Sequence, residues 1–338
     1  MKIAICPRKD SFSDRWIEYC EKNEIDFKLV NPYANDIVAQ VSDCNAFMWH
    51  FHHGDYRDMQ FAKSLILSLE TKGIRCFPDS HTCWHFDDKV AQMYLLESVD
   101  APMVPSYVFY SKEEALEWAD TTTFPKVFKL KGGAGSSNVM LARTKAEAIR
   151  LIKKSFGKGF RQYRWQEKFI EEWRRYTLGM STFHDVLRTL YYAFKKFPTD
   201  FDHYHGKEIG YAYFQDFIPD NPYDIRVCVV GGKAFAVKRM TRKNDFRASG
   251  SGKSVFDKGQ IDERCVIIAF DAAEKLQAQS VSFDFLFDGS NNPLLVEISY
   301  GFPVTWYGKF DGYWTSDMLW HAGSDFDFCG WVVENLIK

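Results

Sequence analysis

The chain has 338 residues, of which 46% are hydrophobic and 17% aromatic, so it can bury two or three domain cores and is not intrinsically disordered. Its 43 basic and 45 acidic residues give a formal net charge of −2, which indicates no class of partner. No apolar run is long enough to span a membrane, and the opening MKIAICPRKD has too short an apolar stretch for a signal peptide. The eight cysteines form no Cys-x-x-Cys pair, so we expect reduced core thiols and a cytoplasmic location.

Residues 1–85 alternate short apolar runs with amphipathic segments. The pattern predicts strands at 2–6, 27–30, 46–51 and 74–77 and helices at 13–23 and 59–72, which is a small parallel α/β domain. Ligands of such sheets lie at the carboxyl ends of strands, where the sequence places His50, His52 and His53. These histidines are either substrate contacts or ordinary loop residues, and their spacing does not make a zinc site.

A helix is predicted from about 82 to 98, with Lys89 on it, then a strand at 104–110 and a short helix at 112–119. The stretch FPKVFKLKGGAGSSNVML, at 124–141, indicates a strand, a glycine-rich turn and a second strand. Strand alternation places Val127, Lys129 and Lys131 on one face. Two ammonium groups beside exposed backbone N–H groups suit a polyphosphate, whereas the alternative is a surface hairpin with solvated lysines.

The segment from Thr144 to about Lys196 is helical by pattern and basic. From Arg143 to Lys196 there are 14 Lys and Arg against 5 Asp and Glu, an excess of 9 positive charges. A helix with an apolar stripe begins at Phe183, and Ser181 or Thr182 can cap it. The basic face is either a solvated surface or a contact for an anionic polymer or an acidic lipid face.

Strands return after residue 211. We expect a strand at 211–218, a hairpin from 225 to 240 around Gly231-Gly232, a helix at 263–279 and a second hairpin from 281 to 298. The tail from Trp306 is rich in aromatic residues and glycine, and its pattern predicts no particular element.

The second hairpin brings two carboxylates together. If Phe287 pairs with Leu294, Asp284 lies directly opposite Glu297. At a separation of about 5 Å and an effective dielectric of about 20, two such charges repel by roughly 3 kcal/mol. A bound cation removes this repulsion, and Mg²⁺ binds one or two carboxylates together with phosphate oxygens and water. The alternative is that one carboxylate is protonated or faces solvent.

Four stretches together carry a family resemblance. They are FPKVFKLKGGAGSSNV, YFQDFIPDNPYDIRVCVVGGKAFAVKR, NDFRASGSG and SFDFLFDGSNNPLLVEIS. In order and spacing, over about residues 80 to 305, they resemble the ATP-grasp superfamily, nearest to ribosomal-protein glutamate ligases and glutathione synthetases. The resemblance implies a mixed α/β (α+β) ATP-grasp fold, with an N-terminal parallel α/β domain at 1–85. It also implies a central subdomain at 86–218 with a helical basic insertion at about 155–207, and a C-terminal subdomain at 219–338.

The resemblance also implies ligands and residue roles. The cofactors are ATP and Mg²⁺, or Mn²⁺ in its place. The phosphate ligands and glycine-rich lid would be Lys89, Lys129, Lys131, Gly132, Gly133, Gly135, Ser136 and Ser137. The adenine hinge would be Gln215, Asp216, Phe217 and Ile218. Arg226 and Arg247 would face the transferred phosphoryl group, and Asp284, Glu297 and Ser299 would bind the metal.

Three details qualify the match. The family usually has Glu-x-Asn on the last metal strand, where this chain has Glu297-Ile298-Ser299, and serine is a poorer Mg²⁺ ligand than an amide carbonyl. A rival hinge lies at 166–170, but 215–218 is preferred because the arginine strand follows it directly. The stretch 250–254, GSGKS, ends like a P-loop, but the first glycine of that motif would fall on Arg247.

The activity implied is an ATP-dependent ligation of a carboxylate to an amine through an acyl phosphate, with release of ADP and phosphate. The substrates would be small molecules or peptides, and no nucleic acid is expected. Two alternatives stay open, a phosphotransferase acting on a hydroxyl and a nucleotide-binding module without turnover.

Overall fold

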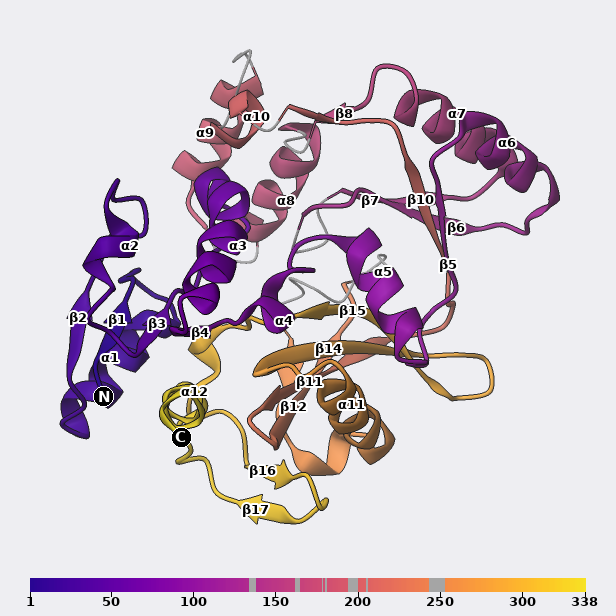
Figure 1. Cartoon of the computed structure of the whole chain (residues 1–338). Coiled ribbons are helices and arrows are strands. Elements are labelled where there is room, and N and C mark those ends of the chain that lie inside the picture. Colours follow the sequence, from indigo (N-terminus) through magenta and orange to yellow (C-terminus); the bar gives the residue numbers. More distant parts are fainter. Residues whose placement is uncertain are drawn as a thin grey trace. The chain divides into compact units, whose positions relative to one another are not determined.

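The computed structural model describes residues 1–133, 138–161, 165–177, 179, 181–193, 200–204, 206–242 and 253–338 (Figure 1). The chain forms two compact units. The first unit contains residues 1–52, 57–104 and 218–338, and the second contains 53–56 and 105–217. The division into three parts at 85 and 218 remains a prediction. In the described residues no helix is both long and apolar enough to cross a membrane.

The first unit begins with a four-stranded parallel sheet, as the sequence predicted. Its strands, in the order β2-β1-β3-β4, are β1 (Ile3–Ile5), β2 (Phe27–Leu29), β3 (Ala46–Met48) and β4 (Arg75–Phe77). Its helices are α1 (Phe12–Lys22), α2 (Ile37–Gln40) and α3 (Tyr56–Thr71). The strands are one to three residues shorter than the apolar runs that predicted them.

The prediction of one helix over 82–98 was wrong. Two helices occupy this region, α4 (Ser80–Cys83) and α5 (Lys89–Ser98). Asp87 has a positive φ of 54°, which no α-helix accommodates, and the Asp88 carboxylate accepts the Ala91 N–H at 3.0 Å. Helix capping by this aspartate therefore outweighs the apolar periodicity, and Lys89 becomes the first residue of α5.

The second half of the first unit is an antiparallel sheet in the order β15-β14-β11-β12-β16-β17, with β13 beside β12. Its strands are β11 (Tyr223–Val230), β12 (Lys233–Met240), β13 (Ser254–Val255), β14 (Ser280–Phe287), β15 (Pro293–Ser299), β16 (Gly312–Thr315) and β17 (Trp320–Ala322). The helical segments are η1 (Lys258–Gln260), α11 (Glu263–Lys275), η2 (Val304–Trp306) and α12 (Phe328–Ile337). The tail that the sequence left unassigned thus supplies two strands and the last helix.

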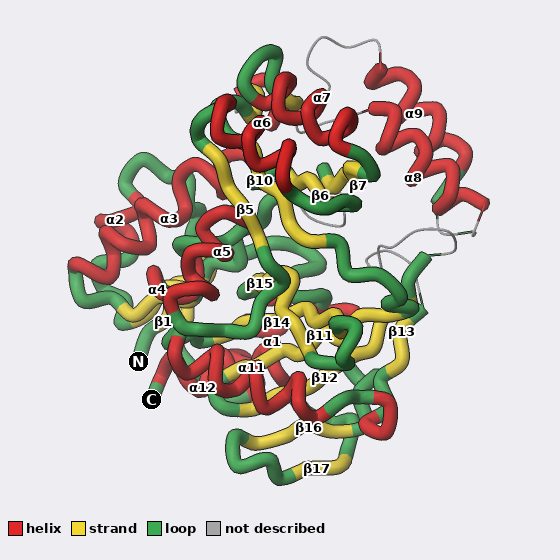
Figure 2. The backbone as a smooth tube through the Cα atoms, turned by 90° about the vertical axis from the view of Figure 1, so that its right-hand side faces the viewer, coloured by secondary structure: helices red, strands yellow, loops and turns green. Residues whose placement is uncertain are grey.

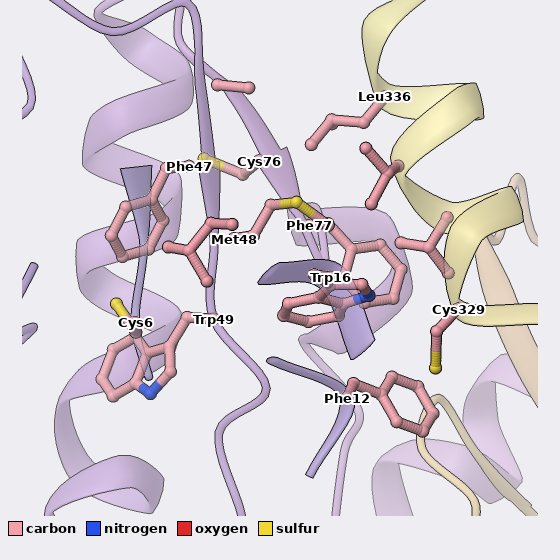
Figure 3. Packing of buried hydrophobic residues seen from close by; sticks show 14 of the residues in the cluster. Cys6, Phe12, Trp16, Phe47, Met48, Trp49, Cys76, Phe77, Cys329 and Leu336 are labelled. Carbon is pink, nitrogen blue, oxygen red and sulfur yellow. The ribbon is translucent and has the colours of Figure 1, made fainter. Parts of the chain in front are cut away.

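One hydrophobic core joins the two sheets of the first unit. Phe12 and Trp16 of α1 lie in it together with Cys329 and Leu336 of α12 (Figure 3). The Tyr300 hydroxyl donates to the Phe51 carbonyl at 2.5 Å, so the end of β15 is fixed against the carboxyl end of β3. All eight cysteines are buried and unbonded to one another, as their apolar surroundings predicted.

The second unit is built on an antiparallel sheet in the order β5-β10-β6-β7. Its strands are β5 (Ser106–Phe109), β6 (Lys126–Lys129), β7 (Val139–Ala142) and β10 (Ala212–Asp216). Helices α6 (Lys112–Thr121) and α7 (Lys145–Ser155) pack side by side on one face, over Phe128, Ala142 and Phe214 (Figure 2). Phe128 therefore points into the core, and the opposite face carries Lys129.

The insertion between β7 and β10 contains α8 (Trp165–Thr177), α9 (Phe183–Ala193), α10 (Asp200–Tyr204) and a two-stranded ladder of β8 (Phe160–Arg161) and β9 (Lys207–Glu208). Thr182 caps α9 by accepting the Asp185 N–H at 3.3 Å, as predicted. The rival hinge at 166–170 lies within α8, whereas the preferred hinge follows strand β10.

Three arginines of the helical hairpin of the insertion pair with acidic residues of their own helix. Arg174, Arg175 and Arg188 each pair with an acidic residue three positions earlier on the same helix, Glu171, Glu172 and Asp185. Exposed pairs of this kind contribute little free energy, but they offset the positive charge locally. The described part of the hairpin therefore gives no support to an anionic polymer or lipid contact.

Candidate active site

Two buried lysines on β6 have different partners. The Lys126 ammonium donates to the Asp216 carboxylate at 2.5 Å and lies 5.2 Å from the centre of the Tyr107 ring. The Lys129 ammonium donates to the side-chain oxygen of Gln215, also at 2.5 Å. Lys126 is thus paired with a carboxylate, and Lys129 with the oxygen of a neutral amide.

Gln215 has a role that the sequence did not reveal. Its amide nitrogen donates to the Ser106 hydroxyl at 3.0 Å, so the amide orientation is fixed and its oxygen faces Lys129. The Asp216 N–H donates to the Pro105 carbonyl at 2.8 Å, so this donor is not available to an adenine ring. Phe217 and Ile218 follow in the connection to β11. The hinge can therefore contact a base only through the Asp216 carbonyl and the two residues after it.

The glycine-rich segment begins in the described part of the chain. The Lys131 N–H donates to the Tyr211 hydroxyl at 2.7 Å, and this hydroxyl donates to Glu208. After Gly132, Gly133 adopts a φ of 117°, which favours glycine. Three predicted lid residues, Gly135, Ser136 and Ser137, lie outside the described residues, as does Arg247.

Asn138 closes this segment and was missed by sequence reasoning. It has a positive φ of 62°, which asparagine tolerates better than most residues. Its side chain is buried, and the side-chain oxygen accepts no hydrogen bond from a described residue. Two features of the sequence could have indicated Asn138, namely its residue type and its position directly after the glycine-rich segment.

The carboxylate pair of the first unit lies where the sequence placed it, but one step of the reasoning was wrong. Asp284 faces Glu297 across β14 and β15. Phe287, however, pairs with Pro293 instead of Leu294, and the register shifts between Asp284 and Phe285. A β-bulge in β15 restores the predicted pairing, because it inserts one unpaired residue into that strand.

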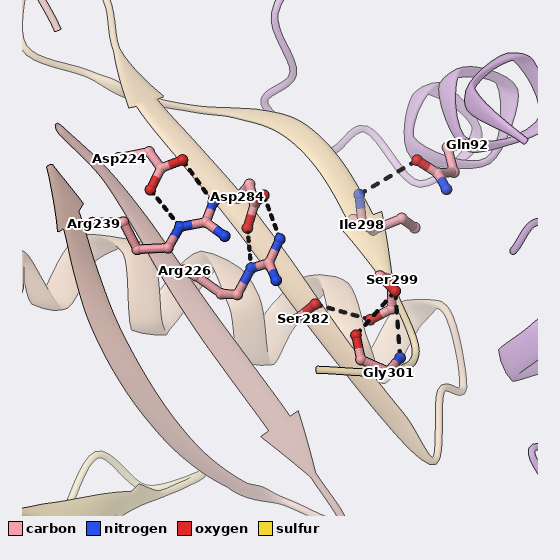
Figure 4. Close-up of polar contacts among 9 residues, drawn as sticks. All are labelled: Gln92, Asp224, Arg226, Arg239, Ser282, Asp284, Ile298, Ser299 and Gly301. Atoms are coloured by element: carbon pink, nitrogen blue, oxygen red, sulfur yellow. Dashed lines mark hydrogen bonds and ion pairs between the residues drawn. The ribbon is translucent and has the colours of Figure 1, made fainter. Parts of the chain in front are cut away.

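Protein cations already neutralise Asp284. Arg226, directly opposite on β11, donates to both carboxylate oxygens at 2.5 and 2.7 Å, and Arg239 donates to one of them at 2.8 Å (Figure 4). Burial alone would raise the pKa of Asp284, but the two guanidinium groups outweigh it and hold the pKa well below its usual range. The predicted repulsion is thus relieved without a bound cation.

Arg226 and Asp284 belong to a row of charged side chains that continues on both sides of them. Arg239 also donates twice to Asp224, its cross-strand neighbour, at 2.7 and 2.6 Å. At the other end, the Lys89 ammonium lies 3.3 Å from Glu297. Burial opposes protonation of Lys89, but the carboxylates of Glu297, Asp87 and Asp88 together outweigh it and raise the pKa of the lysine. Three positive and three negative groups balance, so the row is neutral on its own.

Asp224 and Arg239 were not predicted as site residues. Asp224 could have been found from its Asp-x-Arg spacing to Arg226, because this spacing puts both side chains on one face of β11. Arg239 could be found only with the register of β11 and β12. In the described residues, no group of three or more histidine, cysteine or acidic side chains could hold a metal ion.

Ser299 lies two residues beyond Glu297 at the end of β15. Its hydroxyl donates to the Gly301 carbonyl at 3.0 Å, and its carbonyl accepts the Ser282 hydroxyl at 3.0 Å (Figure 4). The Gly301 N–H approaches the same hydroxyl oxygen at 3.4 Å. The serine thus closes a turn and keeps one lone pair for a further contact.

His50 forms part of the join between the two sheets of the first unit. Its Nδ1 accepts the Phe12 N–H at 3.3 Å and lies 3.0 Å from the Ser11 hydroxyl, which places the proton of the neutral ring on Nε2. A side chain at Gly301 would put its Cβ 2.9 Å from Nε2, so the imidazole ring would have to shift. The choice between substrate contact and loop residue stays open for the three histidines.

The Asp58 carboxylate is buried beside His52 and holds several groups at the carboxyl edge of the parallel sheet. It accepts the Arg8 guanidinium at 2.8 Å, the His52 N–H at 2.6 Å and the Tyr33 hydroxyl. This network fixes the loops after β1 and β3, where ligands of parallel sheets lie.

Two family models match parts of the chain. Residues 88–181 match the ATP-binding domain of the carbamoyl-phosphate synthase large chain, and residues 207–306 match the RimK-like ATP-grasp domain. A comparison with curated protein sequences finds no match.

Solved structures share the fold at low identity. The biotin carboxylase domain of the Hydrogenobacter thermophilus 2-oxoglutarate carboxylase, solved with MgADP and bicarbonate, has a TM-score of 0.61 and 14% identity over 99% of this chain and 69% of its own. A RimK-domain ATP-grasp protein from Sphaerobacter thermophilus has a TM-score of 0.58 and 14% identity, and the match covers all of both chains. D-alanine–D-alanine ligase from Bacillus anthracis has a TM-score of 0.57 and 14% identity, and the match covers 90% of this chain and 88% of its own.

Proposed function

The chain is a member of the ATP-grasp superfamily, and from that premise we propose that it is an ATP- and Mg²⁺-dependent carboxylate–amine ligase. The observation that carries the proposal is Lys129, a buried lysine at the end of β6, the strand that leads into the glycine-rich segment. A lysine ammonium binds phosphate oxygens as a point charge. Phosphoryl transfer depends mainly on such positioned charge.

The second unit supplies the groups proposed to bind ATP. Lys129, together with Lys131 and the glycine-rich segment after it, would contact phosphate oxygens. Gln215 would act as a positioning residue, because its fixed amide oxygen holds the Lys129 ammonium. The Asp216 carbonyl and the backbone of Phe217 and Ile218 would contact the adenine, since the Asp216 N–H is already bonded.

The first unit carries the residues proposed to bind Mg²⁺. Asp284 and Glu297 fit this ion, because they offer only oxygen ligands from facing strand positions. Mg²⁺ would draw charge from the phosphate oxygens when bound. The row that contains these carboxylates is already neutral, so we expect the ion to bind weakly unless nucleotide phosphates accompany it.

The proposed reaction has two steps. A substrate carboxylate oxygen attacks the γ-phosphorus of ATP, ADP leaves, and an acyl phosphate forms. An amine then attacks the acyl carbon, the bond to the phosphate oxygen breaks, and the amine loses its proton to solvent. Arg226 would stabilise the charge on the transferred group, and Lys89 would hold Glu297 in place.

A nucleotide-binding protein without turnover is the second candidate. It is favoured by the Asp284 carboxylate, both of whose oxygens already accept hydrogen bonds from guanidinium groups. A metal ion would have to displace at least one of these bonds, which costs free energy in a buried site.

ADP release distinguishes these candidates. The purified chain is incubated with ATP, MgCl₂ and a panel of carboxylates and amines, and products are identified by mass. The ligase proposal predicts ADP release with a matched pair, and a product whose mass is that of acid plus amine minus water. Nucleotide binding by calorimetry without ADP release for any pair would support the second candidate, and a stable phosphoester would contradict both.

A further inference from the structure

A groove lies beside the edge strand β7 of the second unit. Residues of helix α7, which packs on one face of this sheet (Figure 2), form part of its wall. Its volume is about 320 Å³. The walls combine apolar side chains with three basic ones and a single acidic one. They are Met140, Leu141, Arg143, Glu147, Arg150, Leu151, Lys154 and Phe160.

Positive side chains outnumber negative ones in the groove. Arg143 and Arg150 are exposed, and neither forms an ion pair with a described residue. The Lys154 ammonium lies 4.2 Å from the centre of the Phe160 ring, over the floor of the groove. The one acidic residue, Glu147, has a local task, because its carboxylate accepts the Arg143 N–H at 2.7 Å and caps α7. The groove therefore suits an anionic ligand with apolar parts.

The backbone of β7 is open along the same groove. β7 is the last strand in the order β5-β10-β6-β7 and has no partner on its outer side among the described residues. Leu130 donates to the Asn138 carbonyl, so the hydrogen-bonded pairs of the β6–β7 ladder are Leu130–Asn138, Phe128–Met140 and Lys126–Ala142.

The alternate residues of β7 face away from β6. The N–H and C=O groups of Val139 and Leu141 point to the open edge, and these residues make no hydrogen bond across it to another described residue. An extended peptide that pairs with these four groups adds a strand to the sheet. Every second side chain of that peptide would face α7, where Arg150 and Lys154 lie.

We propose that this edge binds an acidic polypeptide segment in extended conformation. The segment pairs with Val139 and Leu141, and acidic side chains at alternate positions meet Arg143, Arg150 and Lys154. Apolar groups of the segment contact Leu151 and Phe160. The proposal is independent of nucleotide chemistry, because none of these residues belongs to the proposed ATP or metal ligands.

The test uses the full chain and a fluorescent eight-residue peptide in which glutamate alternates with valine. Binding is measured by fluorescence anisotropy at low and high salt. We expect salt-sensitive binding that falls at least tenfold in the Arg150→Glu variant and less than twofold in Lys153→Glu, which alters a basic residue of the same helix outside the groove. Equal effects of the two variants would overturn the proposal.

Two matched probes separate strand pairing from attraction between charges. A peptide with proline in place of each valine keeps the charge but cannot form the ladder, so it should bind at least tenfold more weakly. Inorganic tripolyphosphate should not displace the glutamate–valine peptide at equal concentration. Equal binding of the proline peptide, or displacement by tripolyphosphate, would identify a general anion site and contradict the proposal.

Amide hydrogen exchange supplies the residue-level result. Bound peptide should slow exchange at the Val139 and Leu141 amides at least tenfold. The peptide should slow exchange at the Met140 and Ala142 amides much less, because these amides already donate hydrogen bonds to β6. Protection in the opposite alternation, or no protection with peptide at saturation, would overturn the proposed pairing.

Discussion

Arg226 and Asp284 lie directly opposite each other on β11 and β14 and are joined by two hydrogen bonds of 2.5 and 2.7 Å. The arginine that sequence reasoning assigned to the phosphoryl group thus contacts the aspartate that it assigned to the metal. This pair forms the centre of a row of three positive and three negative side chains from Arg239 to Lys89.

The Asp284→Asn variant tests the pair. Removing one partner of a buried ion pair typically costs about 3–5 kcal/mol, because the other charge stays buried and uncompensated. We expect a loss of this size at pH 7 by urea unfolding. The control is Asp262→Asn, a more exposed pair with Arg264 in which asparagine can still cap α11, with an expected loss below about 1 kcal/mol.

The same variant predicts a pH dependence. The folded-state pKa of Asp284 lies below its unfolded value of about 3.9, so its stabilisation is fully present above that pH and is lost as the pH falls below it. The difference between wild type and Asp284→Asn should therefore shrink by about 1 kcal/mol between pH 7 and pH 3. A difference that stays constant would show that Asp284 is not held ionised by the arginines.

The two lysines of β6 predict opposite phenotypes. Lys129→Met should weaken ATP binding about 10- to 100-fold, because a charge-assisted hydrogen bond contributes about 1.5–3 kcal/mol. Lys126→Met should lower the melting temperature, since it leaves the Asp216 carboxylate without its cation, and should change ATP affinity by less than about twofold. Calorimetry measures the ATP affinity of each variant, and thermal unfolding measures its melting temperature. The account fails here if Lys126→Met weakens ATP binding as much as Lys129→Met does.

Gln215→Glu tests why an amide holds Lys129. A carboxylate at this position neutralises the ammonium, so we expect KM for ATP to rise about tenfold with little change in kcat, since the charge acts on nucleotide binding. The fold should remain, because glutamate matches glutamine in size. A variant with unchanged KM would mean that Lys129 does not contact the nucleotide.

Ser299→Asn probes the metal strand. An asparagine carbonyl is a better Mg²⁺ ligand than a serine hydroxyl, so less Mg²⁺ should suffice for half-maximal ADP release, while Glu297→Gln should nearly abolish release. Titration of Mg²⁺ against the ADP-release rate measures both. An asparagine variant that needs as much Mg²⁺ as wild type would place Ser299 away from the metal, in the turn that it closes with Gly301.

Sequence reasoning succeeded where a local rule decides the structure. Strand alternation predicted that Lys129 and Phe128 lie on opposite faces of their strand, and the second hairpin predicted Asp284 opposite Glu297. Both arrangements are present. The hairpin also shows how a wrong step can be concealed, because the bulge in β15 compensated for the wrong pairing of Phe287. A bulge depends on packing against neighbouring strands, which a single hairpin sequence does not specify.

The remaining features depend on contacts between distant residues. Gln215 holds Lys129 from a strand 86 residues away, and Arg239 reaches Asp284 from a strand 45 residues away. Neither partner follows from periodicity. The break at Asp87 was locally encoded, since Asp88 is a good helix cap, but the apolar spacing of 82–98 obscured it.

The measurement that tests the central proposal most directly follows oxygen atoms. A carboxylate that supports ADP release is prepared with ¹⁸O in both oxygens, and the released phosphate is analysed by mass. An acyl phosphate pathway transfers one ¹⁸O to each phosphate, because the bond to the carboxylate oxygen forms in the first step and the acyl–oxygen bond breaks in the second. Unlabelled phosphate, with ADP and amide formed at the same rate, would contradict the proposed mechanism.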